Sequence, residues 1–171
     1  MEGERAMHYA TLTSLADSIA ESLNTAQVAP APPPVGWASP FAVAFTAART
    51  VLPIIDLSKI GDTLTVAVIP LGYEQERTGG GRTPQYEGHY DIDLLVQQRV
   101  GAGAPAEALV ASLLLLQEQV AEYFKPLAVV LPDGRGCIFG PIEASPAYSQ
   151  RALLEKNTFV GVQTWKFLVP S

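Results

Sequence analysis

The hydrophobic positions of this chain recur with two periods, one typical of helices and one typical of strands. In 9–24, apolar side chains return every three or four residues, which predicts one amphipathic helix of about four turns. A second helical stripe runs from Pro105 to Phe124, and Pro105 suits the first turn of a helix because no backbone N–H is required there. Leu114 and Leu115 widen this stripe, so we expect the second helix to pack across a sheet.

Alternating apolar and polar residues predict the strands. Segment 63–69 is rich in β-branched residues, and 89–100 places Tyr90, Ile92 and Leu94 on one face. We expect these two segments to form an antiparallel hairpin. Between strands, 51–60 should bend with local capping by Asp56 and Ser58, and 146–154 should be irregular or briefly helical. Further strands are predicted at 41–49, 127–131, 137–144 and 158–169.

Two segments interrupt the periodic pattern. Five prolines in 25–40 rule out a helix or a central strand, so this segment is interpreted as a semi-extended connector. It is either a spacer on the surface or a proline-rich ligand for the aromatic groove of a partner. The polar segment 71–88 contains three consecutive glycines and is expected to be a long flexible loop at the tip of the hairpin.

Composition and element order together predict the fold class. Hydrophobic residues make up 48% of the 171 residues and charged residues 16%, a balance typical of a folded chain. We expect a single α+β domain over 1–171, with two packed helices on a mostly antiparallel sheet and the order α-β-β-β-α-β-β.

Charge and cysteine content exclude several classes of function. The net charge is −6 and the 11 Lys and Arg residues are scattered, which argues against tight binding to nucleic acid. No apolar run approaches the roughly 20 residues that a membrane helix needs, and 1–7 lacks the pattern of a signal peptide. Cys137 is the single cysteine, so neither an internal disulfide nor a cysteine-based zinc site is expected.

Two aspartates are the strongest candidates for chemistry. Asp91 and Asp93 lie two residues apart in a predicted strand and therefore share one face, with Glu74 and Glu76 expected across the hairpin. Two carboxylates on one face can hold a divalent metal or act as an acid–base pair, but a solvated polar face gives the same alternation. His89 is expected at a sheet edge. The glycine run lacks the Lys-Ser or Lys-Thr of a phosphate-binding loop, and no nucleophile elbow or HExxH motif is present.

Three segments resemble those of a known family. The first segment is 41–70, in which an aromatic strand and Arg49 are followed by Val-Leu-Pro at 51–53, Asp-Leu at 56–57 and a β-branched strand at 64–70. The second segment is 90–100, which begins with the pattern Tyr-x-Ile-Asp and ends in Val-Gln-Gln-Arg-Val. In 145–169, Ser-Pro-Ala-Tyr continues through Glu155 and Lys156 to a final strand. This order is similar to tail terminators of tailed bacteriophages and related neck and tail-completion proteins, and it covers about two-thirds of the chain.

The resemblance implies assembly rather than catalysis. Such subunits are virion proteins, assembled in the host cytoplasm, that form a ring, usually a homo-hexamer. The ring caps the tail tube and joins it to the head–tail connector or adaptor protein. DNA passes through the channel without specific binding, and no catalytic residue, cofactor or metal is implied. The alternatives are a head-completion or adaptor neck protein, a small metal-dependent hydrolase that uses Asp91 and Asp93, and a cellular adaptor that uses the proline-rich segment.

Exposure and mobility select the contact residues. The tail-terminator hypothesis places partner contacts in the hairpin loop, residues 73–86, and in the segment 35–40 that follows the run of prolines. The candidates are Val35, Trp37, Phe41, Tyr73, Glu74, Glu76, Arg77, Arg82 and Tyr86.

Overall fold

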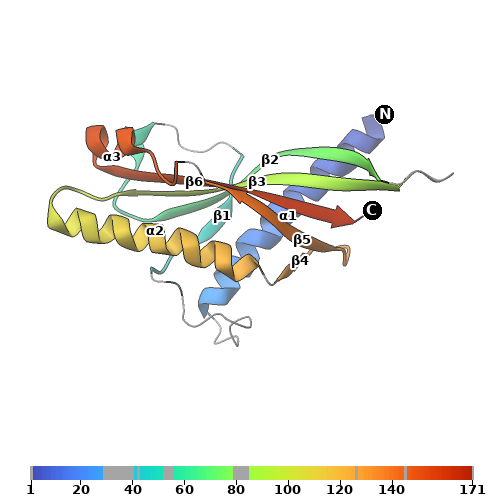
Figure 1. Cartoon of the computed structure of the whole chain (residues 1–171), viewed down its shortest axis with the longest axis horizontal. Coiled ribbons are helices and arrows are strands. Elements are labelled where there is room, and N and C mark those ends of the chain that lie inside the picture. The colour runs from blue at the N-terminus through green and yellow to red at the C-terminus, as the bar shows by residue number, and fades with distance from the viewer. Residues whose placement is uncertain are drawn as a thin grey trace.

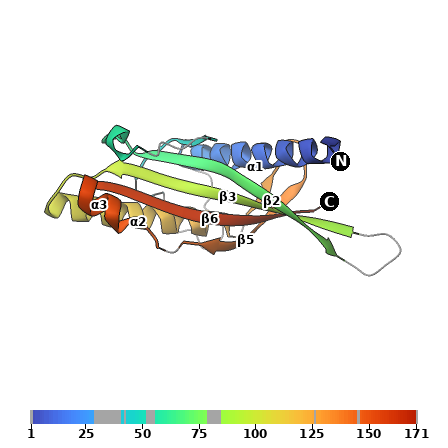
Figure 2. The ribbon, with the colours of Figure 1, turned by 90° about the horizontal axis from the view of Figure 1, so that it is seen from above.

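A twisted six-stranded sheet with helices on its faces forms the framework of the protein in a computed structural model. The structure describes residues 2–28, 41, 43–51, 56–78, 85–125, 127–144 and 146–170. Figures 1 and 2 show α1 and α2 on one side of the sheet, while the short α3 lies on the other side at one end. The helices and the 3-10 turn η1 are α1 (Glu2–Val28), η1 (Leu57–Lys59), α2 (Ala104–Phe124) and α3 (Gln150–Lys156). The strands are β1 (Ala47–Arg49), β2 (Thr65–Thr78), β3 (Gln85–Arg99), β4 (Ala128–Val130), β5 (Gly136–Glu143) and β6 (Thr158–Pro170).

The sheet has the spatial order β1-β2-β3-β6-β5-β4. Only β1 and β2 pair in parallel, and every other neighbouring pair is antiparallel. The predicted α+β class and the order α-β-β-β-α-β-β are therefore confirmed, and the chain continues with α3 and β6. None of the helices in the described part of the chain combines the length and apolarity needed to span a bilayer.

The main core lies between the sheet and the two long helices. Alternate residues of β3 and β6 point at the helices, so Ile92, Leu94, Trp165 and Phe167 are fully buried. Helix α1 meets them with Leu15, Ile19 and Leu23, and α2 with Leu113, Leu116 and Phe124. Both predicted helical stripes thus face one side of the sheet, as amphipathic periodicity requires.

The hairpin of β2 and β3 is longer than its sequence suggests. Segment 71–88 was expected to be a flexible loop, but β2 continues to Thr78 and β3 already begins at Gln85. The pairing runs without a break from Gly72 opposite Asp91 to Thr78 opposite Gln85. The paired segments 72–78 and 85–91 are here called the hairpin arm. Glu74, Gln75 and Glu76, which alternate between its two faces, are all exposed, so polarity alone did not distinguish an exposed ribbon from a loop. The glycines at 79–81 lie outside the described residues.

Other boundaries also differ from the sequence-based expectation. Helix α1 covers 2–28 rather than 9–24, since good helix formers such as Glu4, Arg5 and Ala6 precede the apolar stripe. Segment 41–49 was predicted to be a strand, but it supplies only the three residues of β1. The residues before β1 pack through their rings instead: the ring centroids of Phe41 and Phe45 are 5.3 Å apart, and those of Phe41 and Tyr123 are 5.9 Å apart. His89 lies in the central strand β3 and not at a sheet edge.

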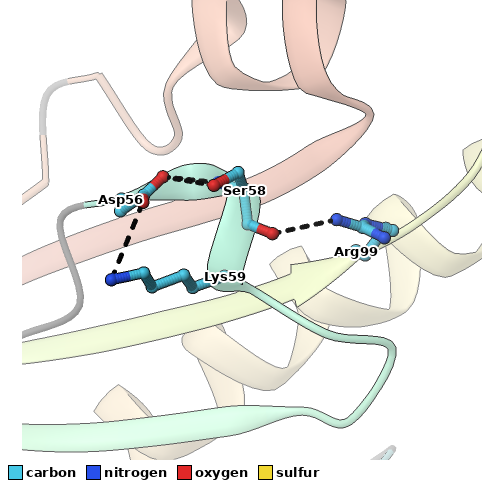
Figure 3. A network of polar contacts seen from close by, with 4 residues as sticks. All are labelled: Asp56, Ser58, Lys59 and Arg99. Carbon is cyan, nitrogen blue, oxygen red and sulfur yellow. Dashed lines mark hydrogen bonds and ion pairs between the residues drawn. The ribbon is translucent and has the colours of Figure 1, made fainter.

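The turn at η1 forms as its sequence predicts. Asp56 Oδ1 accepts hydrogen bonds from the Ser58 backbone N–H at 3.0 Å and from the Ser58 hydroxyl at 2.6 Å, which lowers the pKa of the Asp56 carboxyl. Arg99 Nη2 donates to the Ser58 carbonyl at 3.4 Å and so connects this turn to the end of β3 (Figure 3). Lys59 lies 3.9 Å from the other carboxylate oxygen of Asp56.

Candidate functional site

The sheet surface opposite α1 and α2, here called the open face, carries a group of carboxylates on β2 and β3. Along β3, every second side chain from Glu87 to Asp93 points to this face, because the side chains of a strand alternate. On β2, Glu74 lies opposite His89 and Glu76 lies opposite Glu87. The expectation that Asp91 and Asp93 share a face with Glu74 and Glu76 across the hairpin therefore agrees with the register.

The surroundings of Asp93 make the ionised form of its carboxyl group energetically unfavourable. Its carboxylate accepts a hydrogen bond of 2.6 Å from the Thr164 hydroxyl on β6, the residue directly opposite. Burial raises the pKa of Asp93, the hydrogen bond from Thr164 lowers it, and the charge of Asp91 raises it again. The net direction is upward, so the surroundings of Asp93 disfavour the negative charge that it carries at neutral pH.

Among the side chains that the structure describes, few cations balance the open face. Lys166 on β6 lies opposite Asp91 in the register and is 3.4 Å from the carboxylate of Glu143 on β5. His89 Nε2 is 3.9 Å from a carboxylate oxygen of Glu76. Glu76 and Glu87 face each other directly, an arrangement of like charges that weakens a strand pair. The hairpin arm and the centre of the open face are therefore negatively charged.

An apolar groove lies beside this acidic region. Its volume is about 680 Å³, and it lies between β6 and the segment that leads from β5 to α3. The register of β5 shifts between Phe139 and Ile142, which is a β-bulge, and β5 last pairs with β6 at Glu143. The groove is lined by Ile142, Glu143, Ala144, Pro146, Tyr148, Ser149, Val160, Val162 and Thr164.

The structure separates the predicted contact residues into three groups. Glu74 and Glu76 are exposed on the open face. Phe41 and Tyr73 are half-buried: Phe41 packs on Tyr123, and Tyr73 stacks on Tyr90 with ring centroids 6.0 Å apart. Both rings therefore contribute to the fold. Arg77 and Tyr86 lie opposite each other in the hairpin, and no side-chain position is described for either. Val35, Trp37 and Arg82 lie outside the described residues.

Sequence reasoning missed four members of the open face. Glu87, Glu143, Thr164 and Lys166 complete the charged and polar region around Asp91 and Asp93. The period-two pattern could have found Glu87, because it lies four residues before Asp91 in the same strand. The residues of β5 and β6 gave no such signal, since their position beside β3 is decided by the sheet order.

The described residues do not assemble a metal centre. Among them, no group of three or more His, Cys, Asp and Glu side chains is placed to hold a metal ion. Asp91 and Asp93 project from neighbouring positions of one strand, and Asp93 is engaged by Thr164. The hydrolase alternative therefore gains no support from this geometry.

Comparisons with known proteins complete the description. No protein-family profile matches the chain, and no curated protein matches it. Among solved structures, a chain of the "Virion of native gene transfer agent (GTA) particle" aligns with 12% sequence identity and a TM-score of 0.37. The alignment covers 62% of this chain and 69% of that chain.

Proposed function

We propose that this chain is a structural protein of a phage-type virion, a tail terminator that forms a ring, caps the tail tube and joins it to the head–tail connector. The sequence resemblance supports this role, and its segments 41–70, 90–100 and 145–169 fall largely in the sheet and the elements beside it. The partners are further copies of the chain, the tail tube protein and the connector or adaptor protein.

The acidic open face is the observation that carries the proposal. Surfaces of one charge sign set up a potential that attracts or repels charged molecules as a whole. Glu74, Glu76, Glu87, Asp91 and Asp93 on one face repel the phosphate backbone of DNA. In a ring whose channel is lined by the open face, DNA passes without being held.

The environment of Asp93 supports a functional reason for this charge. Burial raises the pKa of Asp93, so the ionised side chain lowers the stability of the fold. An asparagine would retain the hydrogen bond from Thr164 without this penalty. A destabilising charge in a folded sheet is typical of a position where function and stability compete.

The test is to locate the chain in the particle. Cells that produce particles would express the chain with a C-terminal epitope, and purified particles would be labelled with gold-conjugated antibody and imaged by electron microscopy. We expect label at the head–tail junction, with none on particles from the untagged chain. Label above the junction, at the head vertex, would instead favour a head-completion or adaptor protein. Particles without any label would contradict a virion role.

A further inference from the structure

Strand β6 has a strand partner on one side along its whole length, and on the other side along only part of it. Strand β3 pairs with β6 from Thr158 to Pro170, whereas β5 pairs with it only from Thr164 to Leu168. At the end of the sheet next to α3, β6 therefore runs on past β5 (Figure 2). Among the described residues, no strand covers the outer side of 158–163. An unpaired strand edge offers backbone donors and acceptors to another chain.

Two backbone hydrogen bonds show which residues of β6 turn toward this outer side. The Val100 N–H donates to the carbonyl of Asn157 at 2.8 Å on the β3 side, and the Ser149 N–H donates to the carbonyl of Val160 at 2.8 Å on the opposite side. Successive residues of a strand direct their backbone groups alternately to the two sides, so Val162 turns outward as Val160 does. The N–H and the carbonyl of Val162 have no strand partner on this side among the described residues.

The apolar groove described above lies against this outward-facing backbone. Val160 and Val162 line one wall of it, and the segment between β5 and α3 lines the other. Because β5 stops pairing at Glu143 and Ser149 already holds the carbonyl of Val160, the free stretch beside β6 corresponds to the positions opposite 161–163. Three extended residues span about 10 Å. The groove volume of about 680 Å³ lies within the range of about 300–1,000 Å³ that is typical of ligand sites.

On the open face, the groove borders a row that carries negative charge. Val162 turns its side chain to this face, as Thr164 does two residues further along β6. Thr164 pairs with Asp93 on one side and with Glu143 on the other. The side chain of Glu143 is 68% exposed and lies 3.4 Å from Lys166. A second cation beside Val162 would meet the carboxylates of Glu143 and Asp93, and it would favour the ionised form of Asp93 that burial disfavours.

On the side of the helices, the groove is apolar. Ile142 lies opposite the core residue Trp165, so its side chain points to the helix side of the sheet. The Tyr148 ring stacks on the core residue Phe159, with ring centroids 5.7 Å apart. Ile142 and Tyr148 thus lie near opposite ends of the free stretch of β6. A segment that enters the groove can pack one apolar side chain beside each of them.

We propose that this groove holds a short extended segment of a partner protein, with the pattern apolar–basic–apolar, which pairs with β6 at Val162. The backbone of the basic residue exchanges hydrogen bonds with Val162, and its charged group reaches Glu143 and Asp93. The residues before and after it turn their side chains to the other face, one beside Ile142 and the other beside Tyr148. This inference deepens the proposed function and rests on it for the identity of the partner, a protein that joins this chain in the particle.

Saturation-transfer NMR with a synthetic peptide tests the groove, because this method detects weak binding to a protein of any size. The probe is acetyl-Gly-Val-Lys-Val-Gly-amide, added to the full chain, and we expect saturation to pass to the valine methyl groups of the peptide. A peptide with N-methyl-lysine lacks the N–H that bonds the carbonyl of Val162 and should lose most of the signal. A peptide with glutamate in place of lysine should bind about two- to fivefold more weakly, as for the loss of an exposed ion pair.

Two tryptophan variants locate the binding. Ala144 is exposed and lines the groove, so A144W should fill the groove and abolish the signal, whereas A147W, at an exposed position beyond the lining residues, should retain it. Glu143→Lys should remove the preference for lysine over glutamate. Equal signals for the A144W and A147W variants, or for the N-methyl peptide and its parent, would overturn the inference, and so would the absence of a signal with the wild type. Peptide binding with no label on particles would refute the virion role alone, and label without peptide binding would refute this site alone.

Discussion

At the scale of single residues, Asp93 links charge to stability. Burial raises its folded-state pKa above the ordinary value of 3.8. The folded chain then binds this proton more tightly than the unfolded chain does. Protonation of Asp93 therefore stabilises the folded chain at pH values below the ordinary pKa, and this stabilisation is lost as the pH rises through the folded-state pKa. At neutral pH, ionised Asp93 is therefore a destabilising group.

Asp93→Asn should stabilise the protein at pH 7, by less than about 1 kcal/mol because the carboxyl group is partly solvated. The gain should shrink as the pH falls toward 3, where wild-type Asp93 is itself protonated. Urea unfolding at several pH values measures both effects. Thr164→Val is the matched control: it removes the donor to Asp93, so it should destabilise at pH 7. A gain of D93N that is the same at every pH would contradict the titration argument.

Gly161 is fixed by its contact with α2. A Cβ at this position of β6 would lie 2.3 Å from Nε2 of Gln117, which is buried and has no hydrogen-bond partner among the described residues. Gln163 donates to the Gln117 carbonyl at 3.3 Å and accepts from Trp165 Nε1 at 3.2 Å, so the whole region is closely packed.

Gly161→Ala should therefore lower the free energy of unfolding by about 1–3 kcal/mol, the range typical of overpacking. In a Gln117→Ala background, the same change should cost less, since the clashing amide is gone. A double-mutant cycle by chemical denaturation measures this coupling. Equal losses in both backgrounds would show that the loss has a different cause.

At the scale of elements, α3 depends on the residue that caps its N-terminus. Ser149 is the N-cap: its hydroxyl accepts from the Ala152 N–H at 3.2 Å, and its own N–H donates to the Val160 carbonyl at 2.8 Å. The second bond fixes the start of α3 against β6, beside the apolar groove.

Ser149→Ala should destabilise the protein by about 1 kcal/mol, because one helix N–H loses its partner. Ser149→Asp should retain most of the stability, since a carboxylate also accepts at this position. Hydrogen exchange should show faster exchange confined to α3 in the alanine variant. Unchanged protection of α3 would contradict the role of Ser149 as a cap.

At the scale of the whole molecule, the two layers enclose Cys137. This residue of β5 is 0% exposed, and burial raises the pKa of its thiol to about 11. The thiolate, which is the reactive form, is therefore both rare and inaccessible in the folded protein.

Labelling of Cys137 by a water-soluble disulfide reagent should require opening of the two layers. We expect its rate to rise with urea in step with global unfolding, as for the most protected parts of a fold. Leu154→Cys supplies the control, since Leu154 is 83% exposed and a thiol there should react at once. Rapid labelling of Cys137 in the native protein would show local opening of the β4–β5 edge.

The charge of the open face gives a second prediction for the whole molecule. Replacing Glu74, Glu76 and Glu87 by lysine should turn the hairpin arm from repelling DNA to binding it. Binding to a random DNA duplex should then appear at low salt and weaken steeply as salt rises, because counterions are released. A triple glutamine variant separates lost repulsion from gained attraction. Equal DNA binding by the wild type and the lysine variant would contradict the electrostatic role of this face.

Sequence by itself determined the features that depend on local periodicity. The α+β class, α2 and its start near Pro105, and the shared face of Asp91 and Asp93 all follow from spacing along the chain, because the periods of a helix and a strand fix which side chains lie together. The same holds for the turn at Asp56, whose cap bonds reach only two residues ahead.

Tertiary structure alone decided the features that join distant segments. The strand order brings Thr164 and Lys166 to Asp93 and Asp91, and no spacing in the sequence announces a neighbour that lies more than 70 residues away. The polar hairpin arm was mistaken for a loop because backbone pairing holds its strands, β3 with β6 as well as with β2, and the polarity of the side chains does not reveal that pairing.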